Sequence, residues 1–178
     1  MLPLKLKPLG FDTWKKESWD EYCLRLRLPA DEATRQFYRQ VVYDHFDHFN
    51  HHYPSFKIED YTLAIRSLSA SEAAEKIRTF GDQRMIKWCR QFDEFEKTNN
   101  RYPVFRSMAE KLTFPFPPVL IEPSGLLHPN RSYGRPFHLI EGTHRVSYLN
   151  RMLERGMIPP DSPHAFVCLE PGGTGQLT

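Results

Sequence analysis

The sequence predicts an α+β protein, with a mainly helical N-terminal region beside a smaller C-terminal core of strands and one helix. Apolar residues recur at helical spacing through most of the chain before residue 115. Short β-type runs bounded by proline and glycine dominate after it. With 178 residues, 40% of them hydrophobic, the chain is also long enough to bury a core.

Two helices are expected in the first third of the chain. The first covers residues 13–27 and ends before Pro29. The second covers residues 31–52, with Asp31 as its N-cap and Pro54 after its end. Its apolar stripe at helical spacing consists of Tyr38, Val42, Phe46 (or His45) and Phe49.

One short strand and a helix are expected next. The strand lies within residues 56–65 and is followed by a turn. Ser69 and Glu72 then have the spacing of a capping box, which predicts a helix that ends at Gly81.

Two further helices complete the helical region. One opens at Asp82 and ends near Asn99, and the other covers about 104–112. The first has an apolar stripe, expected to be core, that consists of Met85, Trp88, Cys89, Phe92 and Phe95.

The C-terminal third has the order strand, loop, strand, helix, strand. The strands are expected at 119–121, 137–140 and 163–170, and the helix at 143–155. We therefore divide the chain into a mainly helical region, 1–114, a core, 115–170, and a mobile tail, 171–178.

Composition excludes several classes of protein. The net charge of +2 is too small to indicate a dedicated nucleic-acid binder. The three cysteines are far apart and odd in number, which argues against a disulfide framework or a zinc knuckle. No apolar run approaches the ~20 residues of a membrane span, and no signal peptide is visible. We expect a cytoplasmic protein without a membrane partner.

The segment HLIEGTHRVSYL, residues 138–149, joins a predicted strand to a predicted helix. The N-terminus of a helix presents unpaired N–H groups and attracts phosphate. Gly142 lets the backbone approach a ligand closely, because it has no Cβ. Thr143, His144 and Arg145 can all donate hydrogen bonds to phosphate oxygens. The junction therefore predicts a di- or triphosphate site.

Glu141 is the acidic member of this segment. A carboxylate repels a phosphate unless a cation lies between them, so Glu141 can hold Mg²⁺ or accept the proton of an attacking hydroxyl. Alternation along the strand also allows the side chain to point to the far side of the sheet, toward Arg135 or Arg151.

The order of these elements, with the signature Gly142-Thr143-His144-Arg145 after a strand, resembles the ParB/sulfiredoxin superfamily over about residues 115–170. The resemblance implies a small mixed sheet with helices. In sulfiredoxins the residue after the glycine is the catalytic cysteine, whereas this chain has Thr143, so sulfinic acid reduction is not expected. Partition ParB proteins bind CTP at this junction, and free serine kinases of the superfamily transfer a phosphoryl group. The resemblance thus implies ATP or CTP as the ligand and Mg²⁺ as the cofactor.

These considerations define a set of candidate site residues. Glu141 and His144 are the candidate catalytic residues, and Glu141 is also the candidate metal ligand. The candidate nucleotide and phosphate ligands are Gly142, Thr143, His144, Arg145, Ser147 and Arg135. Arg131 lies in the same loop as Arg135, and this loop can fold over a nucleotide.

A second candidate is the segment DHFDHFNHH, residues 44–52. On a helix, Asp44, His48 and either His51 or His52 share a face, which is a workable metal-binding arrangement. The alternative is a solvated helix end, where histidine suits the helix dipole.

We therefore expect a nucleotide-binding protein with Mg²⁺-dependent NTPase or phosphotransferase activity. The alternative is a non-catalytic module that binds DNA or a protein partner through the same junction. A nuclease is less well supported, because no carboxylate cluster with a lysine is visible.

Overall fold

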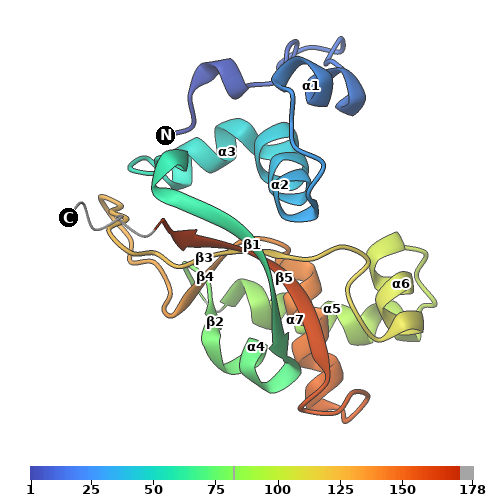
Figure 1. Ribbon diagram of the computed structural model, residues 1–178. Coiled ribbons are helices and arrows are strands. Elements are labelled where there is room, and N and C mark those ends of the chain that lie inside the picture. The colour runs from blue at the N-terminus through green and yellow to red at the C-terminus, as the bar shows by residue number, and fades with distance from the viewer. Residues whose placement is uncertain (82, 173–178) are drawn as a thin grey trace.

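The computed structural model describes residues 1–81 and 83–172 and has the predicted α+β class. Within these residues, five strands form one mixed sheet with the order β1-β5-β3-β4-β2 (Figure 1). Pairs β1/β5 and β3/β4 are antiparallel, and pairs β5/β3 and β4/β2 are parallel. The strands are β1 (Tyr61–Ser69), β2 (Ile77–Arg78), β3 (Val119–Ile121), β4 (Phe137–Glu141) and β5 (Pro163–Pro171).

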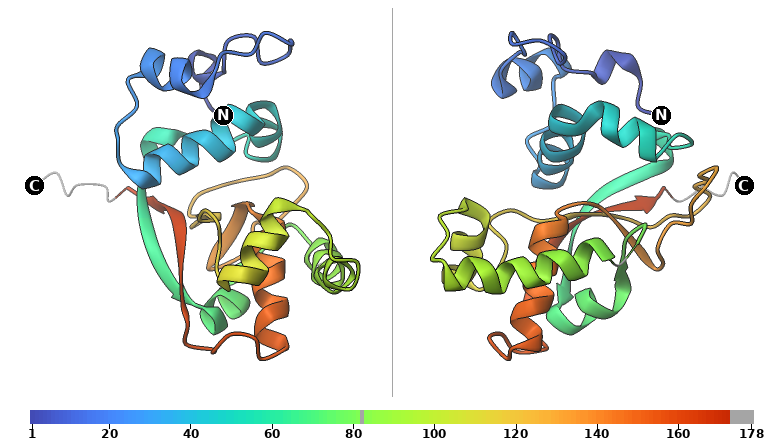
Figure 2. Two further views of the ribbon diagram at one scale, coloured as in Figure 1. Left: turned by 90° about the vertical axis from the view of Figure 1, so that its right-hand side faces the viewer. Right: turned by 180° about the vertical axis from the view of Figure 1, so that it is seen from behind.

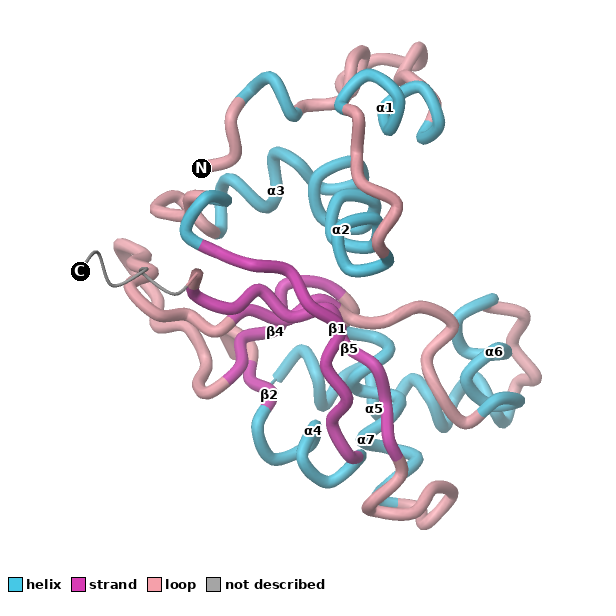
Figure 3. The backbone as a smooth tube through the Cα atoms, viewed as in Figure 1, coloured by secondary structure: helices cyan, strands magenta, loops and turns pink. Residues whose placement is uncertain are grey.

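Helices cover both faces of the sheet, so the fold has three layers (Figures 1 and 3). One layer consists of η1 (Leu4–Leu6), α1 (Trp19–Leu26), α2 (Glu32–Phe37), η2 (Tyr38–Tyr43) and α3 (Asp44–His52). The other consists of α4 (Ala70–Lys76), α5 (Gln83–Lys97), α6 (Pro103–Lys111) and α7 (Thr143–Glu154), in which α5 packs against α7 (Figure 2). A short 3-10 turn, η3 (Ile58–Asp60), leads into β1.

The central strands are buried on both faces because side chains alternate along a strand. Leu120 of β3 lies in the core beneath α4–α7, whereas Val119 and Ile121 lie in the core beneath α1–α3. The same alternation holds in β5, where Phe166 faces one layer and Val167 the other. Two hydrophobic cores therefore share one sheet.

Several predicted elements are confirmed. The Asp31 side chain accepts a hydrogen bond from the Thr34 N–H and caps α2. Ser69 and Glu72 form the predicted capping box at α4. The strand at 119–121, the strand–helix junction at 137–155 and the final strand are also present as elements.

Other predicted boundaries are wrong. The first helix begins only at Trp19, because Ser18 and Glu21 form a capping box there. The long N-terminal helix has a π-helical segment, η2, and a non-helical residue, His45, inside it. The strand expected within 56–65 begins later and extends to Ser69.

The helix expected to end at Gly81 stops at Lys76. The next residue, Ile77, is buried and begins strand β2, which pairs with β4. Strands β1 and β2 thus belong to the same sheet as the C-terminal strands, and the division near residue 115 is not a break in the fold. The predicted cap at Asp82 and residues 173–178 of the predicted tail lie outside the described residues. The first residue of that tail, Pro171, is the last residue of strand β5 instead.

No helix in the described part of the chain has both the length and the apolar character needed to cross a membrane.

Candidate functional site

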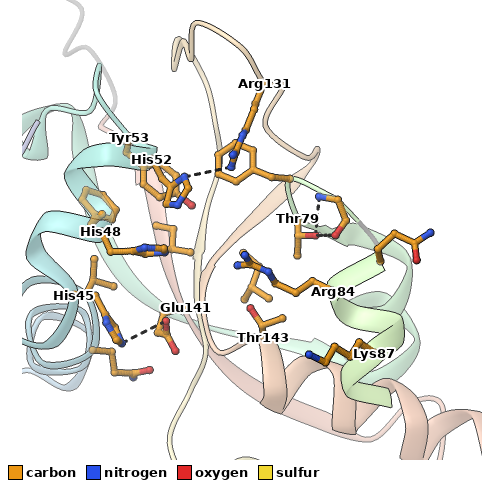
Figure 4. Close-up of a pocket in the computed structure, with 18 residues that line it drawn as sticks. His45, His48, His52, Tyr53, Thr79, Arg84, Lys87, Arg131, Glu141 and Thr143 are labelled. Carbon is orange, nitrogen blue, oxygen red and sulfur yellow. Dashed lines mark hydrogen bonds and ion pairs between the residues drawn. The ribbon is translucent and has the colours of Figure 1, made fainter. Parts of the chain in front are cut away.

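A cavity of about 540 Å³ lies between the two helical layers, at the end of strand β4 (Figure 4). Helical segments η2 and α3 line one wall, and α5 with the residues before it lines the opposite wall. The end of β4 and the first residue of α7 also line it, and Arg131 reaches it from the loop 122–136. Its volume lies within the ~300–1,000 Å³ typical of small-molecule sites.

One wall of the cavity is cationic. Arg84 and Lys87 are three residues apart on α5, so they share a helix face, and both point toward the cavity (Figure 4). Both are exposed, and neither forms an ion pair with a carboxylate of residues 1–81 or 83–172. Thr143, the first residue of α7, lies beside them. Since the helix start adds unpaired N–H groups and partial positive charge, this end attracts anions.

The opposite wall carries His45, His48 and His52, spaced three and four residues apart (Figure 4). Burial, and then the neighbouring His45, lowers the pKa of His48. Burial also lowers the pKa of His52 to about 4, so its ring is neutral at pH 7. Arg131 Nη1 lies 3.4 Å from His52 Nδ1. Because a guanidinium can only donate, Nδ1 accepts and the ring proton lies on Nε2.

The side chains predicted to bind a metal on one face of this helix are not the same set as those that line the cavity. Asp44 lies 3.7 Å from Lys16 Nζ and 3.6 Å from Arg39 Nε instead, and His51 does not line the cavity. Within residues 1–81 and 83–172, no three or more His, Cys, Asp or Glu side chains are grouped so as to hold a metal ion.

Glu141, the candidate metal ligand and catalytic residue, lines the cavity. Its Oε2 is 3.9 Å from His45 Nε2, and its Oε1 is 3.7 Å from Arg145 Nη2. Both distances exceed hydrogen-bond length, so the carboxylate oxygens keep the capacity to accept a proton or bind a cation.

Arg145 does not line the cavity, although it was a predicted phosphate ligand. Its side chain is buried, with Nη1 donating to the Phe116 carbonyl at 2.8 Å and Nη2 to Gln40 Oε1 at 2.7 Å. Burial lowers its pKa to about 10, so it stays charged at pH 7. The fold uses this guanidinium to join α7 to η2 and to the segment before β3.

The remaining predicted ligands are also placed elsewhere. His144 packs against Trp88, with ring centroids 3.8 Å apart, and burial lowers its pKa. Ser147 is fully buried in α7, and Arg135 is exposed outside the cavity. Gly142 is the N-cap of α7 with φ +105°, which places Thr143 at the cavity. Of the six predicted ligands, only Thr143 lines the cavity.

The far end of the cavity is aromatic. Phe80 and Tyr53 line it, and their ring centroids are 6.1 Å apart. The Arg131 guanidinium lies over the Phe80 ring, 5.3 Å from its centroid. Arg131 of the loop expected to fold over a nucleotide thus lines the cavity, whereas Arg135 of the same loop lies outside.

Sequence reasoning missed Arg84, Lys87 and Phe80. The amphipathic pattern of α5 indicated which side of the helix packs into the core. Arg84 and Lys87 lie on the opposite, polar side of the same pattern. Nothing in that pattern shows that the polar side faces a cavity rather than solvent.

Comparison with family models, curated proteins and solved structures gives no significant match to this chain. The resemblance to the ParB/sulfiredoxin superfamily therefore stays a prediction.

Proposed function

We propose that this protein binds a nucleoside triphosphate in the cavity at the end of β4. The observation that carries the proposal is the position of Arg84 and Lys87, which lie beside Thr143 and the start of α7 at one end of the cavity (Figure 4). Two cationic side chains and the N–H groups of a helix start suit a polyphosphate. The predicted phosphate site thus stays at this junction, with cations from α5 in place of Arg145.

The residues present suit Mg²⁺ only together with a bound nucleotide. Mg²⁺ in nucleotide sites is held by one or two carboxylates plus phosphate oxygens and water, and Glu141 supplies one accessible carboxylate in the cavity. The ion would neutralise negative charge that develops on the phosphates during reaction. We infer hydrolysis or phosphoryl transfer as the activity, with Glu141 accepting the proton of the attacking water or alcohol.

The first test measures binding of ATP, CTP, GTP and ADP by calorimetry, each with and without Mg²⁺. We expect Arg84→Ala and Lys87→Ala each to weaken nucleotide binding about tenfold or more, since a charge-assisted hydrogen bond contributes ~1.5–3 kcal/mol. Arg90→Ala is the matched control, because it removes an exposed charge from the same helix outside the cavity. The control should bind within about twofold of the wild type.

The proposal fails if no nucleotide binds, or if Arg90→Ala weakens binding as much as Lys87→Ala does. Binding of duplex DNA with a steep salt dependence would instead support the DNA-binding alternative. Phosphate release by the wild type and its loss in Glu141→Gln test the catalytic part separately. A Glu141→Gln variant that binds nucleotide but has wild-type turnover would remove Glu141 from the mechanism.

A further inference from the structure

The aromatic end of the cavity has a preformed and partly open ring surface. Phe80 is half-buried and held by aromatic neighbours, with its centroid 4.4 Å from that of His138 and 5.2 Å from that of Tyr133. Arg131 covers its face, but the Arg131 side chain is exposed and extends from a loop. The Phe80 ring is thus held in place, whereas the Arg131 side chain that covers it can move.

A guanidinium and a nucleic acid base can each cover the Phe80 ring, and their interactions with it differ in strength. A guanidinium over an aromatic ring at an exposed site contributes about two- to fivefold to an equilibrium constant. A nucleic acid base stacked on an aromatic side chain contributes about five- to 150-fold. A base is therefore expected to replace the guanidinium of Arg131 on the Phe80 ring. The released cation can then cover the other face of the base or contact a phosphate.

The two ends of the cavity are arranged for a ligand with two chemically different parts. Figure 4 shows Tyr53, His52 and Arg131 at one end, and Arg84, Lys87 and Thr143 at the other. Phe80 belongs to the first group, since its ring lies 5.7 Å from that of His52. A planar, uncharged group fits the first end, and a polyanion fits the second.

We propose that Phe80 stacks the base of the bound nucleotide and that Arg131 acts as its movable cover. This inference rests on the proposed function and deepens it, because it names the residue that contacts the base and so favours a nucleotide over an inorganic polyphosphate or a phosphorylated sugar. Phe80 is then the residue that determines this specificity. His52, whose ring is neutral because burial lowers its pKa to about 4, adds one hydrogen-bond donor and one acceptor at the same end.

The test compares ATP and CTP with inorganic tripolyphosphate and ribose 5-phosphate, by calorimetry on the full chain. The wild type should bind the nucleotides at least about tenfold more tightly than tripolyphosphate. Phe80→Ala should remove most of that difference by weakening nucleotide binding, while tripolyphosphate binding stays within about twofold. Lys87→Ala should weaken both ligands.

Phe80→Trp serves as the conservative variant, because it keeps an aromatic ring for stacking and for packing at this position, whereas Phe80→Ala removes both. It should retain the preference for nucleotides, and its added fluorescence should be quenched by ATP but not by tripolyphosphate. Equal affinity of the wild type for ATP and tripolyphosphate would overturn the base-stacking role while leaving a polyphosphate site intact. Failure of every ligand to bind would overturn both this inference and the proposed function.

Discussion

The guanidinium of Arg145 joins segments that lie far apart in the sequence. Besides its bonds to Phe116 and Gln40, its Nη1 lies 3.2 Å from the Pro117 carbonyl, and the Gln40 side chain donates to that same carbonyl. The ring of Phe116 lies beneath the cation at 4.2 Å. Arg145 was predicted to be a phosphate ligand from its position in the sequence, but its N–H groups donate to other residues of the protein.

Arg145→Met should therefore reduce stability. The substitution keeps a long side chain but leaves the Phe116 carbonyl and the Gln40 oxygen without this donor, while the Pro117 carbonyl keeps the Gln40 donor. We therefore expect a loss of about 3 kcal/mol. Urea unfolding measures this difference. Arg101→Ala, at an exposed position, should change stability by less than about 0.5 kcal/mol. An Arg145→Met variant as stable as the wild type would show that these bonds contribute little.

Local signals account for the parts of the junction that the sequence predicted correctly. A β-type run, a glycine and a helical pattern indicated the strand, the turn and the helix at 137–155, and all three are present. The direction of each side chain after Gly142 depends on what packs around the helix. Gln40 and Phe116, which take up Arg145, are 105 and 29 residues away in the chain and carry no signal of that contact.

At the scale of elements, the entry of the chain into α7 depends on one backbone conformation. Gly142 has φ +105°, a region that residues with a side chain rarely adopt. A Cβ there would lie 2.8 Å from Pro118 Cβ and 2.9 Å from Arg145 Nη2. The glycine is therefore required both by its dihedral angle and by the space around it.

Gly142→Ala should destabilise the protein more than Gly156→Ala. Gly156 follows the other end of α7, has φ +65°, and has open space where a Cβ would lie. The control therefore carries only the backbone cost of about 1–2 kcal/mol, whereas Gly142→Ala adds steric overlap. Chemical denaturation of both variants compares the two costs. Equal losses would mean that the surroundings of Gly142 relax freely.

In the helical segment that carries the histidines, the periodic sequence pattern did not predict the local irregularities of the backbone. Periodicity predicted one continuous helix over 31–52, and the chain there is helical but passes through the π-helical segment η2. That segment and the non-helical His45 alter the phase of the residues that follow. The cavity wall consequently contains His45, which the ideal face left out, and not Asp44.

At the scale of the whole molecule, the cavity exists only because two helical layers meet across one sheet. Its lining comes from α3 in one layer and α5 in the other. The periodicity of each segment predicts a helix, but it does not predict which other element lies opposite that helix. Strands β1 and β2 form the two edges of the sheet and pair with the C-terminal strands β5 and β4. Composition and local patterns predicted the α+β class, but the long-range pairing that builds the site required the fold.

A buried histidine behind the aromatic end of the cavity makes the stability of the molecule depend on pH. His138 is fully buried in β4, and its Nδ1 accepts a hydrogen bond from the Gly134 N–H at 3.0 Å. Within the described residues, its Nε2 has no partner. Burial lowers the pKa of His138 from 6.5 to about 4, because a charged ring cannot be solvated there.

The direction of this pH dependence follows from the number of protons that the folded and unfolded states bind. Above pH 6.5 the ring is neutral in both, and stability is at its full value. Between pH 6.5 and about 4 the unfolded chain binds a proton that the folded protein does not, so the free energy of unfolding falls as the pH falls. The full effect is about 3 kcal/mol, since one pKa unit corresponds to ~1.36 kcal/mol.

His138→Asn separates this effect from the titration of carboxylates, which both proteins share. The Asn side-chain oxygen can still accept the Gly134 N–H but does not titrate. Urea unfolding of the wild type and the variant should be measured from pH 7.5 to pH 4. The wild type should lose about 3 kcal/mol more than the variant across that range. Parallel curves would show that His138 is protonated in the folded state, and that its burial does not exclude the charged form.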